Sequence, residues 1–490
     1  MTSEITSLLS SGQLARLIPT VADSKKEERA TSTLLASFMV VPAFATAVLS
    51  DAGASIGKRS KITCYTEVTF KSTDKERKSR PDGLIVINNG SKTWSALIES
   101  KIGNAVLTNE QVEEYLLLAK QHKIDAVITI SNQFATTPTH HPLKIQKSKT
   151  KSVELYHFSW LSLKSKAVLL TGEKKIEDPE QAYILNELVR YLGHDNSGIT
   201  ALNKMPPLWK ELCNTVQNGG ILTGSSDYVI DSVSGWHQLL RHLSLNLSMA
   251  IGQPVTIILT RKREQDADLN FAEDCNHLVN SCELKAEFNV PHAASKLVFS
   301  ADVIRKVINI SMKLEAPKDK ARATASINWL SRQLKNRSQG NLSIRAYWSK
   351  RTPVTMAPLD AIIEDPTVII PPNISGCPTH LEVVRVIDMG ARFKGAKTFI
   401  EDATKEFPKF YHDAGQHLTS WVEKAPKIKN DEPLDVKIST ILSEPSEPSE
   451  PSEPSEPNKL SGLPVERTHS LIVTSSPLSP QITPPDSEAS

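Results

Sequence analysis

Cysteine and long apolar runs are both scarce in this sequence of 490 residues. The five cysteines are odd in number and scattered, which excludes a disulfide framework and predicts a reducing, cytoplasmic setting. The longest apolar stretch, residues 34–49, falls short of the roughly 20 residues that span a bilayer, and it contains Pro42. We expect it to form a buried helix that kinks or ends at this proline. The N-terminus also lacks the basic start and apolar core of an export signal, so we expect no membrane partner.

The sequence lacks an overall excess of charge, since 57 Lys and Arg residues stand against 55 Asp and Glu. The balance is uneven along the chain. Residues 1–166 contain 22 basic and 15 acidic side chains, whereas residues 431–490 contain 3 basic and 11 acidic ones. The near-zero total therefore does not exclude a polyanion such as DNA, because the basic excess lies in the first third of the chain.

The length predicts more than one domain, because single cores usually stop growing at about 250 to 300 residues. We expect a first α/β domain over residues 1–195 and a second α/β or α+β domain over residues 226–425. No catalytic constellation is found in the second region, which we expect to dock a protein partner. Residues 426–490 include five tandem Ser-Glu-Pro units and predict a disordered tail, because such a segment cannot bury enough apolar surface to fold.

Hydrophobic periodicity predicts the individual elements. In the first domain, we expect helices over residues 25–49, 107–122 and 178–192 and strands over residues 62–70, 82–87, 93–102, 124–130 and 153–158. In the second domain, we expect helices over residues 321–334 and 398–422 and strands over residues 255–259, 284–290, 307–312, 342–348 and 381–386.

Two carboxylates lie on one predicted hairpin. Asn88-Asn89-Gly90-Ser91 is a strong turn signal between two of the strands. With the turn centred on Asn89 and Gly90, Asp82 is expected opposite Leu97 and diagonal to Glu99, on the same face of the sheet. Diagonal positions are roughly 7 to 8 Å apart at the backbone, close enough for both carboxylates to share one divalent cation.

Such a pair predicts a metal-dependent chemistry. Two carboxylates at the end of an apolar hairpin repel each other and are costly to desolvate, so a bound cation would compensate them. Mg²⁺ prefers hard oxygen ligands, polarises a phosphoryl oxygen and lowers the pKa of an attacking water. Lys101 projects beside the carboxylates, where its ammonium would orient the water or neutralise charge on the phosphate.

Pro81-Asp82 followed by Glu99-Ser100-Lys101 on the next strand resembles the active site of the PD-(D/E)xK nuclease superfamily, over roughly residues 24–165. Gln111-Val112-Glu113-Glu114-Tyr115 resembles the Gln-x-x-x-Tyr motif of its RecB-like branch. The resemblance implies a restriction-endonuclease-like αβββαβ core and Mg²⁺ or Mn²⁺ as cofactor. It also implies that Asp82 and Glu99 are metal ligands and that Lys101 is the catalytic lysine.

Further residues are assigned by the same resemblance. A glutamate on the first core helix would add a metal ligand, for which Glu28 fits and Glu27 is the competing choice. Glu67 would add another acidic group, and Gln111 and Tyr115 would contact the site or the DNA strand. The basic loop over residues 71–80 includes Lys78 and Arg80, which would bind phosphates without reading bases, as would the lysines of residues 144–151.

Each of these residues also has an ordinary structural interpretation. Thr108 and Gln111 could form a helix capping box, and Tyr115 falls on the apolar stripe of its helix. Glu28 could be an exposed acid in the first turn of its helix, where the helix dipole stabilises a negative charge. Glu67 could lie on the solvated face of an edge strand.

The hypothesis that follows is a Mg²⁺-dependent nuclease, a hydrolase acting on phosphodiester bonds of DNA, in defence, repair or mobile-element processing. The alternative is a catalytically inactive nuclease fold that binds nucleic acid or a protein. A third interpretation is that the hairpin pair is an accident and the protein is an α/β scaffold, which Asp82 and Glu99 carboxylates that point apart would support.

Overall fold

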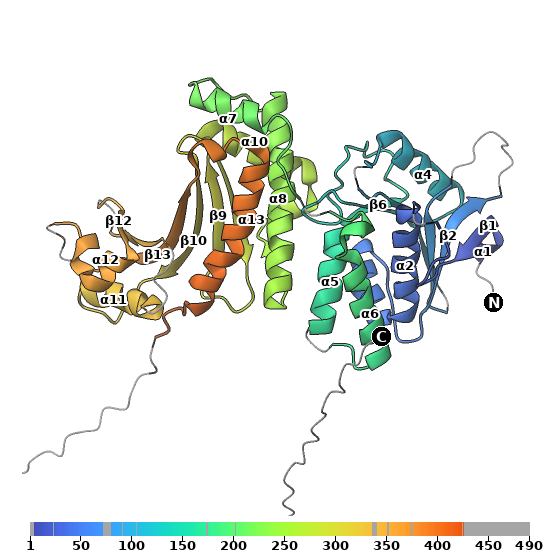
Figure 1. Cartoon of the computed structure of the whole chain (residues 1–490), viewed down its shortest axis with the longest axis horizontal. Coiled ribbons are helices and arrows are strands. Elements are labelled where there is room, and N and C mark those ends of the chain that lie inside the picture. Colours follow the sequence, from blue (N-terminus) through green and yellow to red (C-terminus); the bar gives the residue numbers. More distant parts are fainter. Residues whose placement is uncertain are drawn as a thin grey trace, which may run out of the picture. The chain divides into compact units, whose positions relative to one another are not determined.

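The computed structural model describes residues 4–425, apart from positions 23, 72–79, 91, 104, 173–174, 201, 336–340, 350–351, 373, 375 and 424. Residues 1–424 form one compact unit of mixed α/β structure that contains two sheets (Figure 1). The predicted tail, residues 426–490, lies outside the described residues, as does most of the first basic loop, including Lys78.

The first sheet has six strands, and neighbours in sequence are also neighbours in the sheet. The first four strands run antiparallel to one another, and the last two are parallel to the fourth. The strands are β1 (Leu9–Leu14), β2 (Lys61–Phe70), β3 (Gly83–Asn88), β4 (Thr93–Ser100), β5 (Ala126–Ser131) and β6 (Glu154–Ser159). All the predicted strands of this region are present, whereas β1 was not predicted.

Helices cover both faces of this sheet, because its central strands are apolar on both sides. Along β3, Ile85 and Ile87 face one core, and Leu84 and Val86 face the other. The first core contains α2, α3, α5 and α6, and the second contains α4. The helices are α1 (Glu4–Ser7), α2 (Lys26–Val40), α3 (Pro42–Leu49), α4 (Asn109–Gln121), α5 (Trp160–Gly172) and α6 (Pro179–Leu192).

The apolar stretch around Pro42 forms two helices, as predicted. α2 ends at Val40, and Pro42 is the first residue of α3, where its missing N–H is not needed. Phe38 and Phe44 are fully buried on either side of the break. Among the described residues, no single helix is long and apolar enough to cross a membrane, although the bent pair Lys26–Val40 and Pro42–Ala52 would pass that test if taken together.

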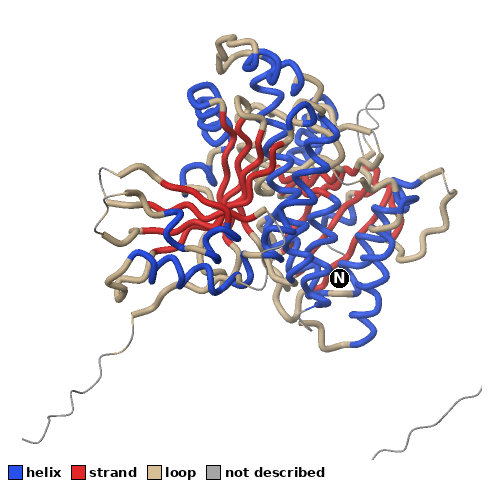
Figure 2. Tube along the Cα trace, turned by 60° about the vertical axis from the view of Figure 1, so that its left-hand side comes forward, coloured by secondary structure: helices blue, strands red, loops and turns tan. Residues whose placement is uncertain are grey.

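The second sheet is antiparallel throughout and has seven strands in the order β12-β11-β13-β10-β9-β8-β7. Figure 2 shows the pronounced twist of its strands. The strands are β7 (Thr256–Ile257), β8 (Glu283–Asn289), β9 (Leu297–Asp302), β10 (Val307–Glu315), β11 (Leu342–Tyr347), β12 (Thr355–Pro358) and β13 (His380–Asp388). β9 and β12 were not predicted.

The long helices of this region pack on one face of the second sheet, where α8 and α13 lie side by side (Figure 1). The predicted helix over residues 398–422 is too long, because α13 ends at Asp413 and the chain turns at Gly415. α8 also packs against α5 of the first region. The helices are α7 (Trp209–Gln217), α8 (Asp227–Ile251), α9 (Arg261–Gln265), α10 (Ala267–Ser281), α11 (Ala323–Leu334), α12 (Leu359–Glu364) and α13 (Ala396–Asp413).

Two histidines, buried His157 and half-buried His141, fix the loop after β5 to the sheet. His157 donates from Nε2 to the carbonyl of Gln133 (3.0 Å), so its Nδ1 accepts from Thr129 Oγ1 (2.8 Å). The same hydroxyl accepts from His141 Nε2 (2.8 Å), and His141 Nδ1 accepts from the N–H of Leu143 (3.1 Å). This pattern satisfies every ring nitrogen with both rings neutral. Burial lowers the pKa of His157 to about 4.

The buried His157 is expected to make the stability of the protein depend on pH. An unfolded histidine takes up a proton near pH 6.5, whereas folded His157 does so only near pH 4, so stability falls as the pH falls through this window. At about 1.4 kcal/mol per factor of ten in proton affinity, this contribution is on the order of 3 kcal/mol. Urea unfolding of the wild type and of His157→Gln between pH 7 and pH 4 measures it. The variant should show the shallower dependence, and parallel curves would contradict the assignment.

Candidate metal centre

The hairpin of β3 and β4 brings Asp82 and Glu99 directly opposite each other. Gly83 pairs with Ile98, so the next pair along the ladder is Asp82 and Glu99, and the predicted pairing of Asp82 with Leu97 is wrong. The turn lies one residue later than predicted, because Asn89 donates to the carbonyl of Lys92 and Gly90 takes the positive φ of 90°. The Cβ atoms of directly opposed residues are about 4.5 to 5.5 Å apart, closer than those of diagonal residues. The observed register therefore places the two carboxylates closer together than the predicted one.

Glu99 is held by one oxygen only. Its Oε1 accepts from Lys101 Nζ (2.5 Å) and from Gln111 Nε2 (2.5 Å). Its Oε2 is buried without a hydrogen-bond partner among the described residues, and the residue as a whole is 1% exposed. A buried carboxylate oxygen without a partner costs free energy, and such an atom calls for an explanation such as an ion.

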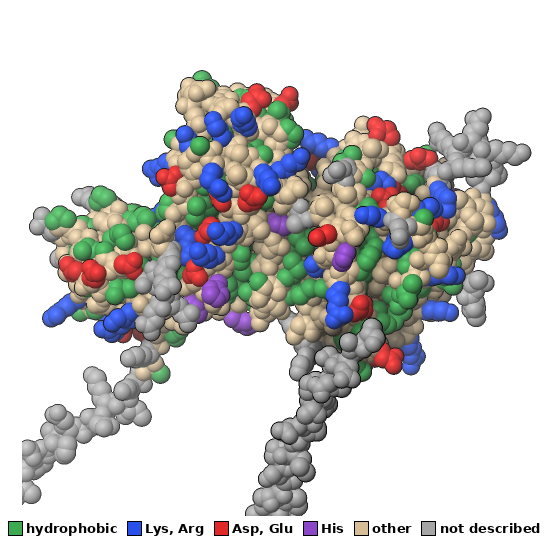
Figure 3. Space-filling model, in the orientation of Figure 1, with side chains coloured by type: hydrophobic (Ala, Val, Ile, Leu, Met, Phe, Trp, Pro, Cys, Tyr) green, Lys and Arg blue, Asp and Glu red, His purple; other side chains and the backbone are tan. Residues whose placement is uncertain are grey.

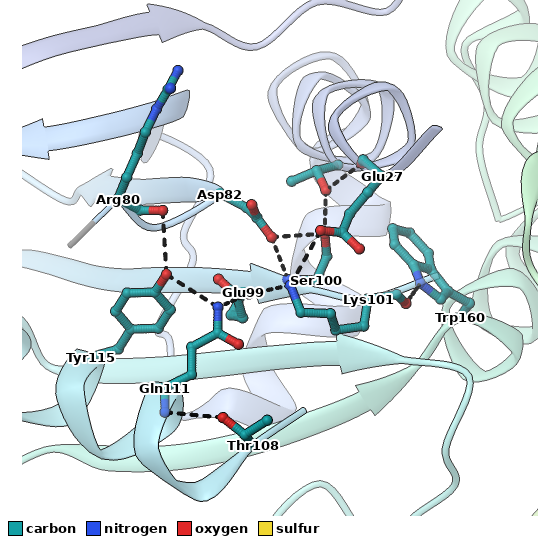
Figure 4. A network of polar contacts seen from close by, with 11 residues as sticks. Glu27, Arg80, Asp82, Glu99, Ser100, Lys101, Thr108, Gln111, Tyr115 and Trp160 are labelled. Atoms are coloured by element: carbon teal, nitrogen blue, oxygen red, sulfur yellow. Dashed lines mark hydrogen bonds and ion pairs between the residues drawn. The ribbon is translucent and has the colours of Figure 1, made fainter. Parts of the chain in front are cut away.

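Asp82 is also held by one oxygen. Its Oδ2 accepts from the backbone N–H of Ser100 (2.7 Å) and from the Ser100 hydroxyl (3.1 Å), as Figure 4 shows. Ser100 was not among the predicted site residues, because it is the middle residue of Glu99-Ser100-Lys101 and the motif gives no signal for it. The arrangement leaves one oxygen of each carboxylate, Oδ1 and Oε2, outside these hydrogen bonds.

The two carboxyl groups resist ionisation. Burial, and then the charge of Glu99, raise the pKa of Asp82 to about 7. The pKa of Glu99 is likewise raised by burial, against the opposing effect of the Lys101 ammonium. Two carboxyl groups with raised pKa values and one nearby lysine form a site whose negative charge is only partly compensated.

Lys101 completes the cluster and connects it to α2. Burial alone would lower the pKa of Lys101, but its hydrogen bond to Glu99 and the charges of Glu99, Asp82 and Glu27 raise it. Its Nζ lies 3.2 Å from Glu27 Oε1 and its carbonyl accepts from the indole of buried Trp160 (2.9 Å). Lys101 therefore stays charged next to both carboxylates.

Of the two glutamates that compete on the first helix, the structure brings Glu27 into the cluster. Glu28 instead forms an ion pair with the exposed Lys25 (2.7 Å). The sequence contains a signal for this choice, because Glu27 stands four residues before buried Thr31 and seven before buried Leu34, on the stripe of α2 that faces the sheet.

The Gln-x-x-x-Tyr motif also reaches the site. Thr108 caps α4 by accepting from the N–H of Gln111 (3.3 Å), so half of the capping-box interpretation is confirmed. The Gln111 side chain does not return to the cap but donates to Glu99. Tyr115 is 5% exposed, and its hydroxyl donates to the carbonyl of Arg80 (3.3 Å). Tyr115 is thus both a core residue and a neighbour of the site.

Other predicted residues lie differently. Glu67 takes a positive φ of 54° where β2 bulges against β1, and its carboxylate pairs with the guanidinium of Arg80. Three lysines of the second basic loop contact other protein groups. Lys144 lies over the ring of Phe271, Lys147 is 3.6 Å from Asp268, and Lys149 pairs with Glu113.

The donor set fits a hard divalent cation that keeps much of its water. Within the described ranges, no group of three or more His, Cys, Asp or Glu side chains is placed to hold a metal ion by itself. Asp82 and Glu99 offer two carboxylate oxygens, and Mg²⁺ characteristically binds through one or two carboxylates with water filling the remaining positions. The partnerless Oε2 of Glu99 is the atom that such an ion would satisfy.

Comparison of the chain with protein-family models, with curated proteins and with solved structures finds no match.

Proposed function

We propose that the protein is a metal-dependent nuclease that hydrolyses phosphodiester bonds of DNA in the cytoplasm. The observation that carries the proposal is the buried Oε2 of Glu99, which has no hydrogen-bond partner in the described part of the chain and belongs to the residue opposite Asp82. An apolar or hydrogen-bonded pair would be more stable at this position, so two buried carboxyl groups with raised pKa values favour a functional site.

The fold supports the proposal at the level of element order. α2, β2, β3, β4, α4 and β5 occur in the chain order of the αβββαβ core of the PD-(D/E)xK nucleases, with α3 between α2 and β2, and the two motifs lie at the start of β3 and the end of β4. Pro81-Asp82 immediately precedes β3, and Glu99-Ser100 ends β4 with Lys101 directly after it. We therefore assign residues 24–165 to that fold as part of the proposal.

Each side chain has a role in the proposed reaction. Asp82 and Glu99 would hold Mg²⁺ or Mn²⁺, with Glu27 as a further acidic group beside Lys101. The ion would supply Lewis acidity and a water of lowered pKa. Lys101 would stabilise negative charge that develops on the phosphate, because it is a fixed cation within a largely buried site. Gln111 would keep Glu99 oriented through its hydrogen bond to Oε1.

DNA binding through a single large basic patch is not supported on the face shown in Figure 3, where Lys and Arg side chains alternate with Asp and Glu. The lysines near residue 147 would have to exchange their contacts with Asp268 and Glu113 for phosphates. Such contacts are sequence-independent and weaken with salt. We propose that the protein binds DNA mainly through Arg80, which is 57% exposed and stands two residues before Asp82, and whose guanidinium would exchange the Glu67 carboxylate for a phosphate.

The alternative function is a nuclease-like fold that binds nucleic acid or a protein without cleavage. It is favoured by the size of the second region, whose seven-stranded sheet has its own core from Met205 to Leu418. That region would be the docking site of a protein partner.

A cleavage assay separates these functions. The purified full-length chain is incubated with circular and linear, single- and double-stranded DNA in Mg²⁺, Mn²⁺ or EDTA, with RNA in parallel. We expect cation-dependent degradation of DNA that EDTA abolishes. Cleaved circles would identify an endonuclease, and products from linear DNA alone an exonuclease. DNA that is bound equally in Mg²⁺ and EDTA without shortened products would support the binding function instead.

A further inference from the structure

A chain of two buried hydroxyl groups connects Asp82 to helix α2. Ser100 Oγ lies 3.1 Å from Asp82 Oδ2 and 2.6 Å from Thr31 Oγ1, and Thr31 Oγ1 lies 2.8 Å from the carbonyl of Glu27. Ser100 is fully buried and Thr31 is 1% exposed, so water does not compete for these bonds. Thr31 donates to the Glu27 carbonyl, which has no hydrogen of its own, and Ser100 donates to the Asp82 carboxylate. Each hydroxyl has one hydrogen, so the contact between Ser100 and Thr31 is made only by sharing one of these two hydrogens.

We propose that Ser100 and Thr31 are positioning residues of the metal centre, whose hydroxyls fix Asp82 through Oδ2 and tie it to the helix that carries Glu27. This inference rests on the proposed function, because it assigns the fixed carboxylate to a divalent cation of the Mg²⁺ class. It goes beyond the motif, in which the residue between Glu99 and Lys101 has no assigned role.

The geometry of Asp82 supports this role. Both hydrogen bonds from Ser100 fall on Oδ2, and within the described part of the chain no other donor to this carboxylate is present. One oxygen is thereby occupied and the other remains available. Ligand carboxylates are commonly oriented by such outer hydrogen bonds, and their loss typically costs about 10- to 100-fold in metal affinity or activity.

The helix side of the connection is equally specific. Thr31 stands one turn after Glu27, where its hydroxyl donates to the Glu27 carbonyl and contacts the Ser100 hydroxyl at the end of β4. Lys101, the residue after Ser100, contacts the Glu27 side chain at 3.2 Å. The hydroxyl pair and the ion pair therefore hold the same turn of α2 against the same end of β4, as Figure 4 shows.

The chain offers a matched control on the same strand. Ser95 donates from its backbone N–H (2.8 Å) and its hydroxyl (3.2 Å) to Asp125 Oδ2, which repeats the geometry of Ser100 and Asp82. Ser95 is also fully buried, but it lies near the other end of β4. Ser95→Ala therefore removes the same kind of hydrogen bond without touching the proposed site.

The test measures binding of the metal alone. Mn²⁺ and Mg²⁺ are titrated calorimetrically into the full-length wild type, Ser100→Ala, Ser95→Ala, Thr31→Val and Thr31→Ser, and the thermal unfolding of each variant is recorded. We expect Ser100→Ala to weaken cation binding about 10-fold or more, and Thr31→Val to weaken it in the same direction. Ser95→Ala should bind like the wild type, and Thr31→Ser, which keeps the hydroxyl, should restore binding.

The outcomes are distinguishable. Equal cation affinity in Ser100→Ala and the wild type would overturn the positioning role while leaving the metal site in place. Equal losses in Ser95→Ala and Ser100→Ala would overturn it as well, by showing a general effect of strand packing. A wild type that binds neither cation would instead overturn the proposed function, and the inference with it. Both serine variants should unfold at similarly lowered temperatures, so stability alone cannot produce the expected difference in binding.

Discussion

Replacing Glu99 by glutamine is expected to lower the rate of Mg²⁺-dependent DNA cleavage by about 10³-fold. The substitution keeps the shape of the side chain and an oxygen that can accept from Lys101 and Gln111, but it removes the negative charge that would hold the cation. A bound cation contributes several kcal/mol to stabilising a phosphoryl transition state, and each factor of ten in rate is about 1.4 kcal/mol. Initial rates on plasmid DNA at saturating Mg²⁺ measure the effect.

The matched control for this prediction is Glu28→Gln. It makes the same chemical change on the residue after Glu27, but Glu28 forms its ion pair with exposed Lys25 instead of with Lys101. Cleavage by this variant should stay within about twofold of the wild type, because an exposed ion pair contributes little. A Glu99→Gln variant that retains more than a tenth of the wild-type rate would contradict the assignment of Glu99.

Glu99→Gln should lose activity without losing stability. The pKa of Glu99 is raised by burial, so the folded protein is penalised for keeping this group ionised. A neutral amide removes that penalty, while Lys101 keeps Glu27 as a partner at 3.2 Å. If Glu99 were retained for stability, its substitution would lower both the stability and the activity of the protein. Loss of activity at unchanged stability is therefore the combination that marks a functional residue.

The first sheet could be predicted from the sequence because its signals are local. β-branched residues recur along β2 and are concentrated in β3, and residues 88–90 mark the turn between β3 and β4. The one-residue error in pairing arose because Gly90 can take a positive φ at either central position of a two-residue turn. Asn88 decides the register by accepting from the N–H of Gly90 through its side chain (2.8 Å), which periodicity does not reveal.

Much of the second region could not be predicted, because its elements depend on distant contacts. α8 is the longest described helix, yet it contains Gly235, a residue that costs about 1 kcal/mol relative to alanine within a helix. A Cβ at this position would collide with the ring of Pro206, so the glycine is required by packing between segments. Similarly, β1 has the sequence Leu-Ser-Ser-Gly-Gln-Leu, which has little strand propensity, and it pairs because β2 offers an edge.

The residues of the two motifs were predicted to lie together, whereas the two buried hydroxyl residues beside them were missed. Asp82, Glu99, Lys101, Gln111 and Tyr115 do lie together, since a hairpin and the following helix must return to the same end of the sheet. Ser100 and Thr31 were missed because a buried serine or threonine differs little from an ordinary core residue in sequence. Their role depends on which atoms the fold places within hydrogen-bonding distance.

Replacing Lys101 by methionine is expected to lower the cleavage rate by about 10²- to 10³-fold, the range found when a donor to a developing negative charge is removed. Methionine keeps much of the aliphatic length, so packing against the site changes little. The cation that lies 2.5 Å from Glu99 and 3.2 Å from Glu27 is lost. Single-turnover rates at saturating Mg²⁺ report this loss directly. Lys120→Met, an exposed lysine on α4, should leave the rate unchanged.

Lys101→Met should also destabilise the fold, in contrast to Glu99→Gln, because removing one member of a buried ion pair leaves the other charges uncompensated. Asp82, Glu99 and Glu27 would then face one another without their ammonium partner, and added Mg²⁺ should raise the unfolding temperature of this variant more than that of the wild type. An Mg²⁺ effect of the same size in both proteins would mean that the cation does not bind at these carboxylates. Lower stability in Lys101→Met but not in Glu99→Gln, with activity lost in both, is the result expected of a cluster in which the lysine compensates carboxylates that a metal ion also needs.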